Sequence, residues 1–201
     1  VANLSIDHNT MAWKPKDSGK WKWILMDLDR GFFNPTENLI DFYIGQRRLP
    51  LKELLAQASY KEYFAKRLTA RLYTGFHPDR MKQLIIERSQ AIEAEMPRHI
   101  SRWEGTTSAY GDAIPSLEFW KERVRRVERF VEQRPAALLA DLQNYGFSET
   151  ANLTLRTSPE EGGSIKIESL RLPGSNWSGP YLKNIDIQLT AENKPGYAFV
   201  A

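Results

Sequence analysis

The most informative stretch of this chain reads Gly19-Lys20-Trp21-Lys22-Trp23-Ile24-Leu25-Met26-Asp27-Leu28-Asp29-Arg30-Gly31-Phe32. Its aromatic and aliphatic middle, residues 21–26, is typical of a β-strand. The preceding segment, residues 14–20, is rich in Lys, Pro, Ser and Gly and predicts a turn. Trp13 lies in a short apolar stretch before that turn. The sequence therefore predicts a β-hairpin whose second strand ends in two aspartates.

These aspartates, Asp27 and Asp29, stand two positions apart where the predicted strand ends. Residues at that spacing point to the same face of a strand, so both carboxylates can converge on one cation. Oxygen ligands without a neighbouring His or Cys suit Mg²⁺ or Mn²⁺. Asp29-Arg30-Gly31 also has the Asp-x-Gly form of a kinase metal-binding loop. The alternative is a polar strand end at which an Asp caps the following turn.

A second polar segment, residues 3–9, precedes the hairpin and contains Asp7-His8-Asn9. An Asp and an Asn on such a loop can supply a catalytic base and a further metal ligand, as in kinase catalytic loops. An Asx-rich turn explains the same residues without any catalysis. His8 is a further candidate for a group that acts near neutral pH, but a single His is more often structural.

A polar segment over residues 31–50 follows, and for it we expect a long loop with one short helix. Helical spacing of apolar residues then begins, and the pattern at 59–62 predicts a capping box. A second helix is predicted to begin at Pro78 and a third at about Ser116. Pro135 is expected to interrupt or restart the third helix. Its basic residues alternate with Glu, which indicates a solvated face.

Apolar and polar residues begin to alternate after Ser148. Half-buried strands are predicted at Leu153 and Leu155, at Ile165 and Ile167, at Ile185, Ile187 and Leu189, and at the final residues 196–201. Gly- and Pro-rich turns such as 172–176 separate them. We therefore predict an α+β fold with two parts. Residues 1–148 form a mostly helical part with an N-terminal β-hairpin, and residues 149–201 form a small all-β module.

The composition is that of an ordinary folded protein, with 201 residues of which 41% are hydrophobic and 26% charged. A formal charge of +3, from 28 Lys plus Arg against 25 Asp plus Glu, is too small to favour nucleic-acid binding. The absence of cysteine excludes a disulfide scaffold, a thiol nucleophile and a Cys-ligated metal site. No apolar run approaches the ~20 residues of a membrane span.

Several of these segments together resemble the C-terminal part of the CotH-type kinase domain, named for spore coat protein H, followed by the β module often found after it. The resemblance covers nearly the whole chain. It rests on the stretch 19–32, the Leu54-Leu55 segment that leads into the helix Tyr60–Arg71, the block Glu95–Trp103, and the helix from Trp120 to Arg134-Pro135.

The resemblance implies an atypical, extracytoplasmic protein kinase that transfers the γ-phosphoryl group of ATP to Ser or Thr of coat or surface proteins with Mg²⁺ or Mn²⁺. Asp27 and Asp29 match the metal-binding pair of the family, and Asn9 matches the loop Asn that follows the catalytic base. The base is expected about four residues before Asn9, where Ser5 stands, and Asp7 is close but out of register. Asp7 and Asn9 are therefore the catalytic candidates, and cofactor-binding residues are not assigned.

Residue 1 is Val, and no Gly-rich phosphate loop, ATP-pairing Lys or partner Glu precedes the hairpin. We therefore expect a fragment that lacks the ATP-binding lobe and is inactive by itself. The resemblance implies a secreted or cell-surface bacterial protein whose partner is a protein substrate at the cell or spore surface. The alternative is a non-catalytic surface scaffold or adhesion protein with a degenerate kinase-like core. Asp27 and Asp29 favour the kinase, whereas Ser5 favours the scaffold.

Overall fold

The computed structural model describes residues 10–17, 19–26, 31–45, 50–106 and 114–200. Its first element confirms the predicted hairpin, in which β1 (Thr10–Trp13) pairs antiparallel with β2 (Lys22–Leu25). Trp13 stands opposite Lys22, whose ammonium group lies 4.9 Å from the centre of the Trp13 ring. The lysine therefore covers part of an indole that is otherwise open to solvent.

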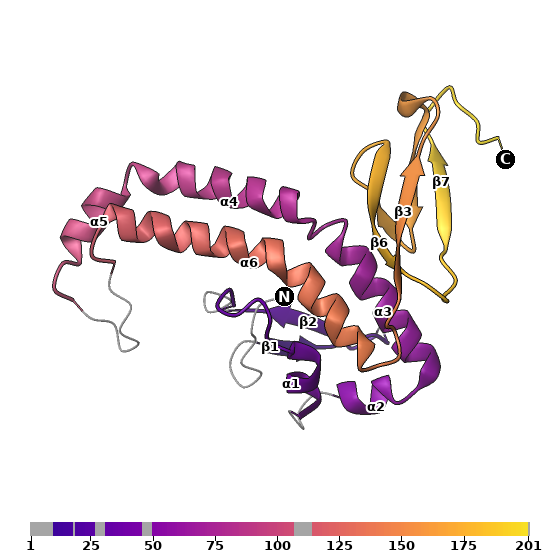
Figure 1. Ribbon diagram of the computed structural model, residues 1–201, viewed down its shortest axis with the longest axis horizontal. Helices are drawn as coiled ribbons and strands as arrows, with labels where there is room; N and C mark the ends of the chain where they lie inside the picture. Colours follow the sequence, from indigo (N-terminus) through magenta and orange to yellow (C-terminus); the bar gives the residue numbers. More distant parts are fainter. Residues whose placement is uncertain (1–9, 18, 27–30, 46–49, 107–113, 201) are drawn as a thin grey trace.

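Helices form the middle of the chain, as expected for an α+β protein. In the described residues they are α1 (Leu39–Gly45), α2 (Leu51–Leu55), α3 (Ala58–Leu72), α4 (Pro78–Glu93), α5 (Met96–Arg102) and α6 (Leu117–Gln143). The long helices α4 and α6 lie side by side and form an arm whose outer end carries α5 (Figure 1). No residue of α4 is buried, because an arm of two helices leaves one side of each open to solvent.

The predicted starts of the second and third helices are confirmed. α4 begins at Pro78, where the missing N–H of proline costs no helical hydrogen bond. α6 begins after Ser116, whose Oγ accepts a hydrogen bond from the backbone N–H of Phe119 at 3.1 Å. The segment 31–50, expected as a loop with one short helix, contains α1 in its described part.

Two details of the helix predictions are wrong. The capping box expected at 59–62 does not form, because α3 already begins at Ala58 and Ser59 lies inside its first turn. Pro135 neither interrupts nor restarts α6, which continues through it to Gln143. A proline inside a helix removes one backbone hydrogen bond. Packing offsets that loss here, since both Pro135 and Arg134 are buried.

The β module follows α6 and consists of two small antiparallel sheets. Its strands are β3 (Thr150–Arg156), β4 (Gly163–Ile167), β5 (Leu170–Arg171), β6 (Asn176–Leu182) and β7 (Leu189–Asn193). β3 pairs with β6, while β4 lies between β5 and β7. The alternation at Leu153 and at Ile165 therefore predicted two strands correctly.

Two strand predictions in the module are wrong in part, and β6 was not predicted. Ile185 and Ile187 precede β7 instead of extending it, because pairing with β4 begins only at Leu189; both still pack against the core. Residues 196–200 form no strand. β6 forms where the sequence shows no alternation and contains Pro180, which disfavours strands. Its pairing with β3 along its whole length stabilises it.

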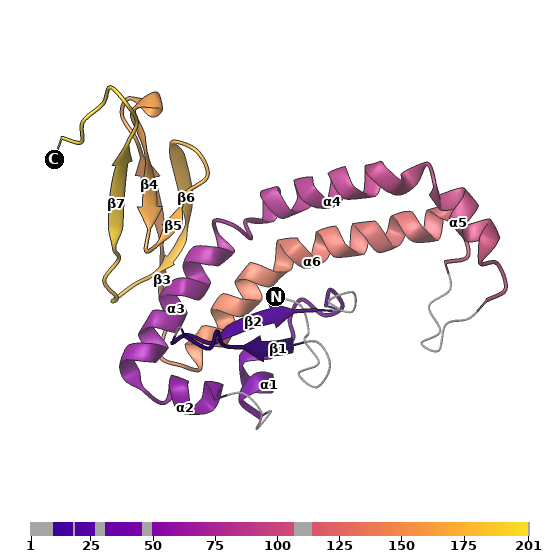
Figure 2. The ribbon, with the colours of Figure 1, turned by 180° about the vertical axis from the view of Figure 1, so that it is seen from behind.

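The β module and the helical part share a hydrophobic core. Its buried residues are Ile40, Leu55, Ala65, Ala70, Leu142, Ile167, Leu172, Trp177, Tyr181 and Leu182. Trp177 of β6 donates its indole N–H to the carbonyl oxygen of Tyr73, at the end of α3, over 2.6 Å. Figure 2 shows the module beside α3. The division into 1–148 and 149–201 stays a prediction, and across it the two parts are in buried contact.

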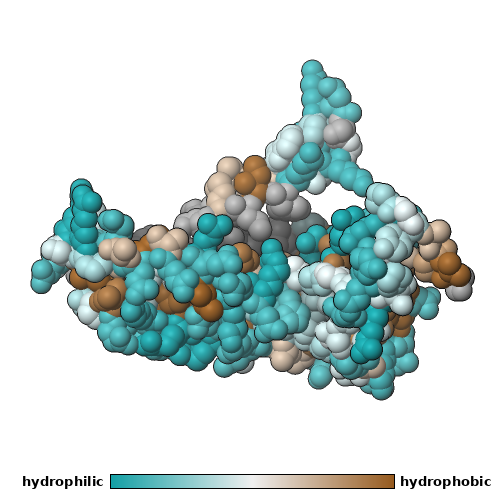
Figure 3. All heavy atoms as spheres, turned by 90° about the horizontal axis from the view of Figure 1, so that it is seen from above, coloured by the Kyte–Doolittle hydropathy of each residue, from teal (hydrophilic) through white to brown (hydrophobic). Residues whose placement is uncertain are grey.

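The surface seen along the top of the arm is mostly hydrophilic, with small hydrophobic patches (Figure 3). Among the helices in the described ranges, none combines the length and the apolar character needed to cross a membrane. Exposed apolar side chains occur on the hairpin, where Met11 and Ile24 stand opposite each other on one face.

Candidate functional site

The residues that follow the Asp27–Asp29 segment lie against α6. Gly31 is buried, and the Phe32 ring meets the Phe130 ring of α6 with centroids 5.3 Å apart. The planes of the two rings are 81° apart, an edge-to-face arrangement. It sets the positive edge of one ring on the negative face of the other and is favourable for aromatic pairs. The backbone after the aspartates is therefore packed onto the long helix.

Arg126 of α6 contacts the next residue, Phe33. Its Nη2 donates a hydrogen bond to the Phe33 carbonyl oxygen at 3.3 Å. Its guanidinium carbon lies 4.7 Å from the centre of the Phe33 ring, within the range of a cation–π contact. One side chain of α6 thus contacts both the backbone and the ring of Phe33.

Arg134 is buried and joins two carbonyl groups of the same segment. It is only 3% exposed, and its Nη1 donates to the carbonyl oxygens of Pro35 and Glu37, each at 2.7 Å. Burial of a guanidinium is unfavourable unless hydrogen bonds compensate it. The two carbonyls belong to an irregular segment, in which backbone acceptors need partners other than a helix or sheet. Arg134 Nη1 therefore provides a donor for both of these carbonyls.

Arg126, Phe130 and Arg134 are spaced four residues apart and lie on one face of α6. We call these three residues the α6 clamp. The clamp contacts residues 32–37 through an aromatic edge, a stacked guanidinium and three charge-assisted hydrogen bonds. It therefore holds the backbone of residues 32–37 against α6.

The far end of this segment, at the start of α1, contacts Tyr145, two residues after the end of α6. The side-chain oxygen of Asn38 accepts a hydrogen bond from the backbone N–H of Asp41 at 2.9 Å. The Tyr145 phenol donates a hydrogen bond to the Asp41 carboxylate. Burial and this bond to a carboxylate raise the pKa of the Tyr145 phenol. Burial also raises the pKa of Asp141, which is 8% exposed; the nearby Arg134 opposes this increase and Asp41 adds to it.

Comparison with protein families gives this arrangement a context. The family model described as CotH kinase protein matches residues 3–138, a range that contains the hairpin, both polar segments and the α6 clamp. The chain belongs to the CotH kinase family. It is accordingly a kinase-like protein, and the family relation indicates nucleotide and metal use in general terms. No curated protein and no solved structure matches the chain.

The four residues predicted to carry kinase chemistry, together with His8, lie outside the described residues. They are Asp7 and Asn9 as catalytic candidates, and Asp27 and Asp29 as metal ligands. Their roles stay predictions. Within the described ranges, no group of three or more His, Cys, Asp or Glu is arranged to hold a metal ion. The structure instead shows the parts on either side of the acidic pair, which are β2 and the clamped segment.

The clamp residues of this CotH kinase family member were not predicted to have any function. From the sequence, Arg134 belongs to the helix end that resembles the family, and Arg126 belongs to a basic run typical of a solvated face. A signal was nevertheless present, because Arg134 stands among the apolar residues Phe130, Val131 and Leu138 of an amphipathic helix. A charged residue in such a stripe is rarely buried without a partner. The identity of that partner is not visible in the local pattern.

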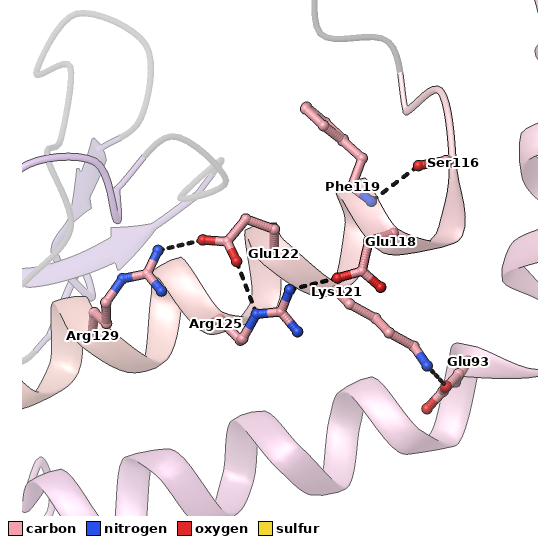
Figure 4. Close-up of polar contacts among 8 residues, drawn as sticks. All are labelled: Glu93, Ser116, Glu118, Phe119, Lys121, Glu122, Arg125 and Arg129. Atoms are coloured by element: carbon pink, nitrogen blue, oxygen red, sulfur yellow. Dashed lines mark hydrogen bonds and ion pairs between the residues drawn. The ribbon is translucent and has the colours of Figure 1, made fainter.

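Several of the other charged residues on α6 form ion pairs in solvent, as the alternation of signs predicts (Figure 4). Arg125 lies 2.7 Å from Glu118 and 2.8 Å from Glu122, and Arg129 lies 2.6 Å from Glu122. Hydrogen bonds from Arg129 and Arg125 lower the pKa of Glu122. Exposed pairs of this kind contribute little to stability. This face is a solvated helix surface, distinct from the clamp face.

A hollow of about 320 Å³ in the β module is lined by residues of β4, of β7 and of the segment 197–200. Its carboxylate, Glu192, is paired within the module with Lys166 and, at 2.7 Å, with Arg171. These two cations lower the pKa of Glu192. Glu192 is thus already paired within the module. The candidate site stays the Asp27–Asp29 pair predicted from the sequence, which lies outside the described residues.

Proposed function

We propose that this chain is the C-terminal lobe of an atypical protein kinase that transfers the γ-phosphoryl group of ATP to Ser or Thr hydroxyls of coat or surface proteins. The observation that carries the proposal is the family match over residues 3–138. The position of β2 supports it, since that strand ends just before the Asp-x-Asp segment, and the α6 clamp holds the residues beyond. Phosphoryl transfer depends mainly on such positioning and on neutralisation of charge.

The donor groups of the acidic segment fit Mg²⁺ or Mn²⁺. The chain has no Cys, and Asp27 and Asp29 offer carboxylate oxygens, the donor type that both ions prefer. When bound, the ion supplies positive charge to the phosphate oxygens of ATP. The role we assign to this chain is to present the two carboxylates between β2 and the segment that begins at Phe32.

Asp7 and Asn9 take the remaining roles in this proposal. A kinase needs a base that accepts the proton of the substrate hydroxyl, and we assign this role to Asp7. Asn9 follows as the second metal-binding residue. Ser5 occupies the position where the family resemblance leads us to expect the base, so Asp7 must reach the hydroxyl from a neighbouring position in the loop.

The proposed partners are protein substrates at the cell or spore surface, and the proposed location is secreted or surface-attached in a bacterium. Both follow from the family resemblance. A non-catalytic surface scaffold is the second candidate, and Ser5 at the expected base position is the observation that favours it.

Calorimetric titration of the full-length natural protein with ATP and Mn²⁺, together with transfer of radiolabelled phosphate to protein, tests the proposal. Asp27→Asn and Asp29→Asn are expected to abolish Mn²⁺-dependent ATP binding and transfer. Asp17→Asn removes the same charge in the exposed hairpin turn and is the matched control that leaves both unchanged. Asp7→Asn is expected to abolish transfer while ATP binding persists.

Two results would count against this assignment. If both Asn variants at the acidic pair retain wild-type Mn²⁺-dependent ATP binding, then the metal ligands are wrongly assigned. If the wild type shows no phosphate transfer under any metal and substrate condition, the scaffold becomes the better description.

A further inference from the structure

The net charge of the chain is concentrated in the hairpin. Residues 10–26 contain four lysines, and Asp17 is the single acidic residue among them. The chain has 28 Lys plus Arg and 25 Asp plus Glu, so the residues outside the hairpin carry 24 basic and 24 acidic side chains and balance. The whole formal charge of +3 therefore belongs to this one element. A charge that is small for the whole chain is thus a strong local signal.

The lysines lie at the turn of the hairpin, beside two tryptophans. We call the following six residues the hairpin tip: Trp13, Lys14, Lys16, Lys20, Trp21 and Lys22. Trp13 ends β1, Lys22 begins β2, and the other four lie between them. All six are exposed, with Trp13 at 45% and Trp21 at 64%. Among the described strands β1 and β2 pair only with each other, so no further strand covers the tip.

The charges of the hairpin tip are not neutralised by acidic side chains. Lys14, Lys16 and Lys20 form no ion pair within the described part of the chain. The ammonium group of Lys22 contacts the Trp13 ring instead, 4.9 Å from its centre. Two exposed arginines of α6, by comparison, are paired with glutamates (Figure 4). The tip therefore presents positive charge that the fold itself does not use.

Exposed tryptophan beside lysine indicates which kind of anionic partner fits. The indole ring has an apolar body and a polar N–H, and it is enriched where lipid tails meet head groups. A lysine keeps its ammonium group in water while its methylene stem lies along the apolar layer. An acidic protein would need pockets that fit both rings, whereas a bilayer surface accepts them without a defined pocket. The chemistry of the tip therefore favours a lipid surface.

We propose that the hairpin tip is a binding site for anionic lipid bilayers, with Trp13 and Trp21 at the head-group boundary and the four lysines at the lipid phosphates. This role goes beyond the proposed phosphoryl transfer, and none of the residues assigned to that reaction belongs to the tip. Each lysine near an anionic membrane surface contributes about fivefold in affinity. A net charge of three therefore predicts about 100-fold stronger binding to anionic than to neutral bilayers.

Co-sedimentation of the full chain with lipid vesicles provides the test. Vesicles of phosphatidylcholine alone are compared with vesicles of phosphatidylcholine and phosphatidylglycerol in equal parts. The wild type is expected to bind the mixed vesicles about 100-fold more tightly. This preference is expected to disappear at about 1 M salt, where charges interact only within roughly 3 Å.

Variants of the tip separate the contributions of charge and of the aromatic rings. Lys16→Gln combined with Lys20→Gln is expected to weaken binding to the mixed vesicles by about 25-fold. Trp21→Ala is expected to weaken binding too, but without a change in its dependence on salt, because the indole carries no charge. These side chains are exposed, so the circular dichroism spectrum of each variant is expected to match that of the wild type.

A matched control distinguishes the position of the charge from its amount. Lys52→Gln combined with Lys194→Gln lowers the net charge of the chain by as much as the double substitution in the tip. Both lysines are exposed, lie outside the hairpin and form no ion pair with any described residue. Charges far from the lipid surface are screened by salt, so this variant is expected to bind the mixed vesicles within about twofold of the wild type.

The results that contradict the proposal are specific. Equal binding of the wild type to the two kinds of vesicle overturns it, and so does an equal loss in the two double variants. Binding to poly-glutamate that depends on Lys16 and Lys20, without a preference for the mixed vesicles, overturns it as well and identifies an acidic protein as the partner. None of these readouts depends on phosphate transfer, so failure of the kinase assignment is detected separately.

Discussion

Replacement of Trp177 by alanine is expected to destabilise the helices together with the β module. Trp177 is 6% exposed in β6, and its indole N–H donates to the carbonyl oxygen of Tyr73 at the end of α3. It also belongs to the core cluster that contains Ala65 and Ala70 of α3 and Leu142 of α6. Truncation therefore removes contacts on both sides of the junction at once.

The magnitude follows from the buried area and the hydrogen bond. A buried aromatic side chain removes about 150–250 Å² from water, which corresponds to about 4–6 kcal/mol at about 25 cal/mol per Å². Measured costs of Trp→Ala in cores are about 3–5 kcal/mol. We expect the free energy of unfolding to fall by about 4 kcal/mol, or the melting temperature by about 8–16 °C for a chain of this size.

Thermal unfolding followed by far-ultraviolet circular dichroism measures the helices, and hydrogen exchange of the β4 amides measures the module. Both are expected to shift together in Trp177→Ala. Trp177→Phe keeps most of the apolar contact and loses the N–H, so its expected cost is about 1–3 kcal/mol. Trp21→Ala, at a side chain that is 64% exposed, is the control with little effect. A helical transition at the wild-type temperature in Trp177→Ala would refute the shared core.

Two further predictions concern packing and pH. Gly163→Ala is expected to lower the free energy of unfolding by about 1–3 kcal/mol, because a Cβ there would lie 2.6 Å from the Glu192 carbonyl oxygen of β7. Gly19→Ala, where a Cβ meets nothing within 4 Å, is the control in the same thermal unfolding measurement. Equal stability of the two variants would contradict the clash. Burial raises the pKa of Asp141 above 3.8, so the folded state keeps this proton to higher pH than the unfolded state, and the group adds stability as the pH falls through its folded pKa. In urea unfolding, Asp141→Asn is therefore expected to be more stable than the wild type at pH 7 and to lose that advantage near pH 4. A variant that is less stable than the wild type at pH 7 would instead show that the Asp141 charge is needed beside Arg134.

Local sequence signals predicted much of this fold. The hairpin follows from the Trp21–Met26 run and the turn before it, and the starts of α4 and α6 follow from Pro78 and Ser116. These signals work because a strand, a turn or a helix cap depends on residues within a few positions of one another. The same reasoning failed at 59–62, because α3 begins at Ala58, before the position that the capping pattern indicates.

The candidate site, like the fold, could be predicted from the sequence only in part. The Asp-x-Asp pair after a strand, and the resemblance to the CotH-type kinase domain, are visible in the residues alone, and the family match over 3–138 confirms the second of these. The roles of Asp7, Asn9, Asp27 and Asp29 stay predictions. The contribution of α6 became visible only when the helix was seen against residues 32–37.

The order of amino acids alone thus accounts for the α+β class, the hairpin and the kinase family, since each depends on neighbours or on a linear series of motifs. Folding decides the partners of Arg134 and Trp177. Arg134 bonds to carbonyls 99 and 97 positions away, and Trp177 bonds to one 104 positions away. Backbone carbonyls are the same in every residue, so no side-chain pattern marks which of them a distant donor will meet. Those contacts, which join α6 to residues 35–37 and the β module to the end of α3, exist only once the chain has packed.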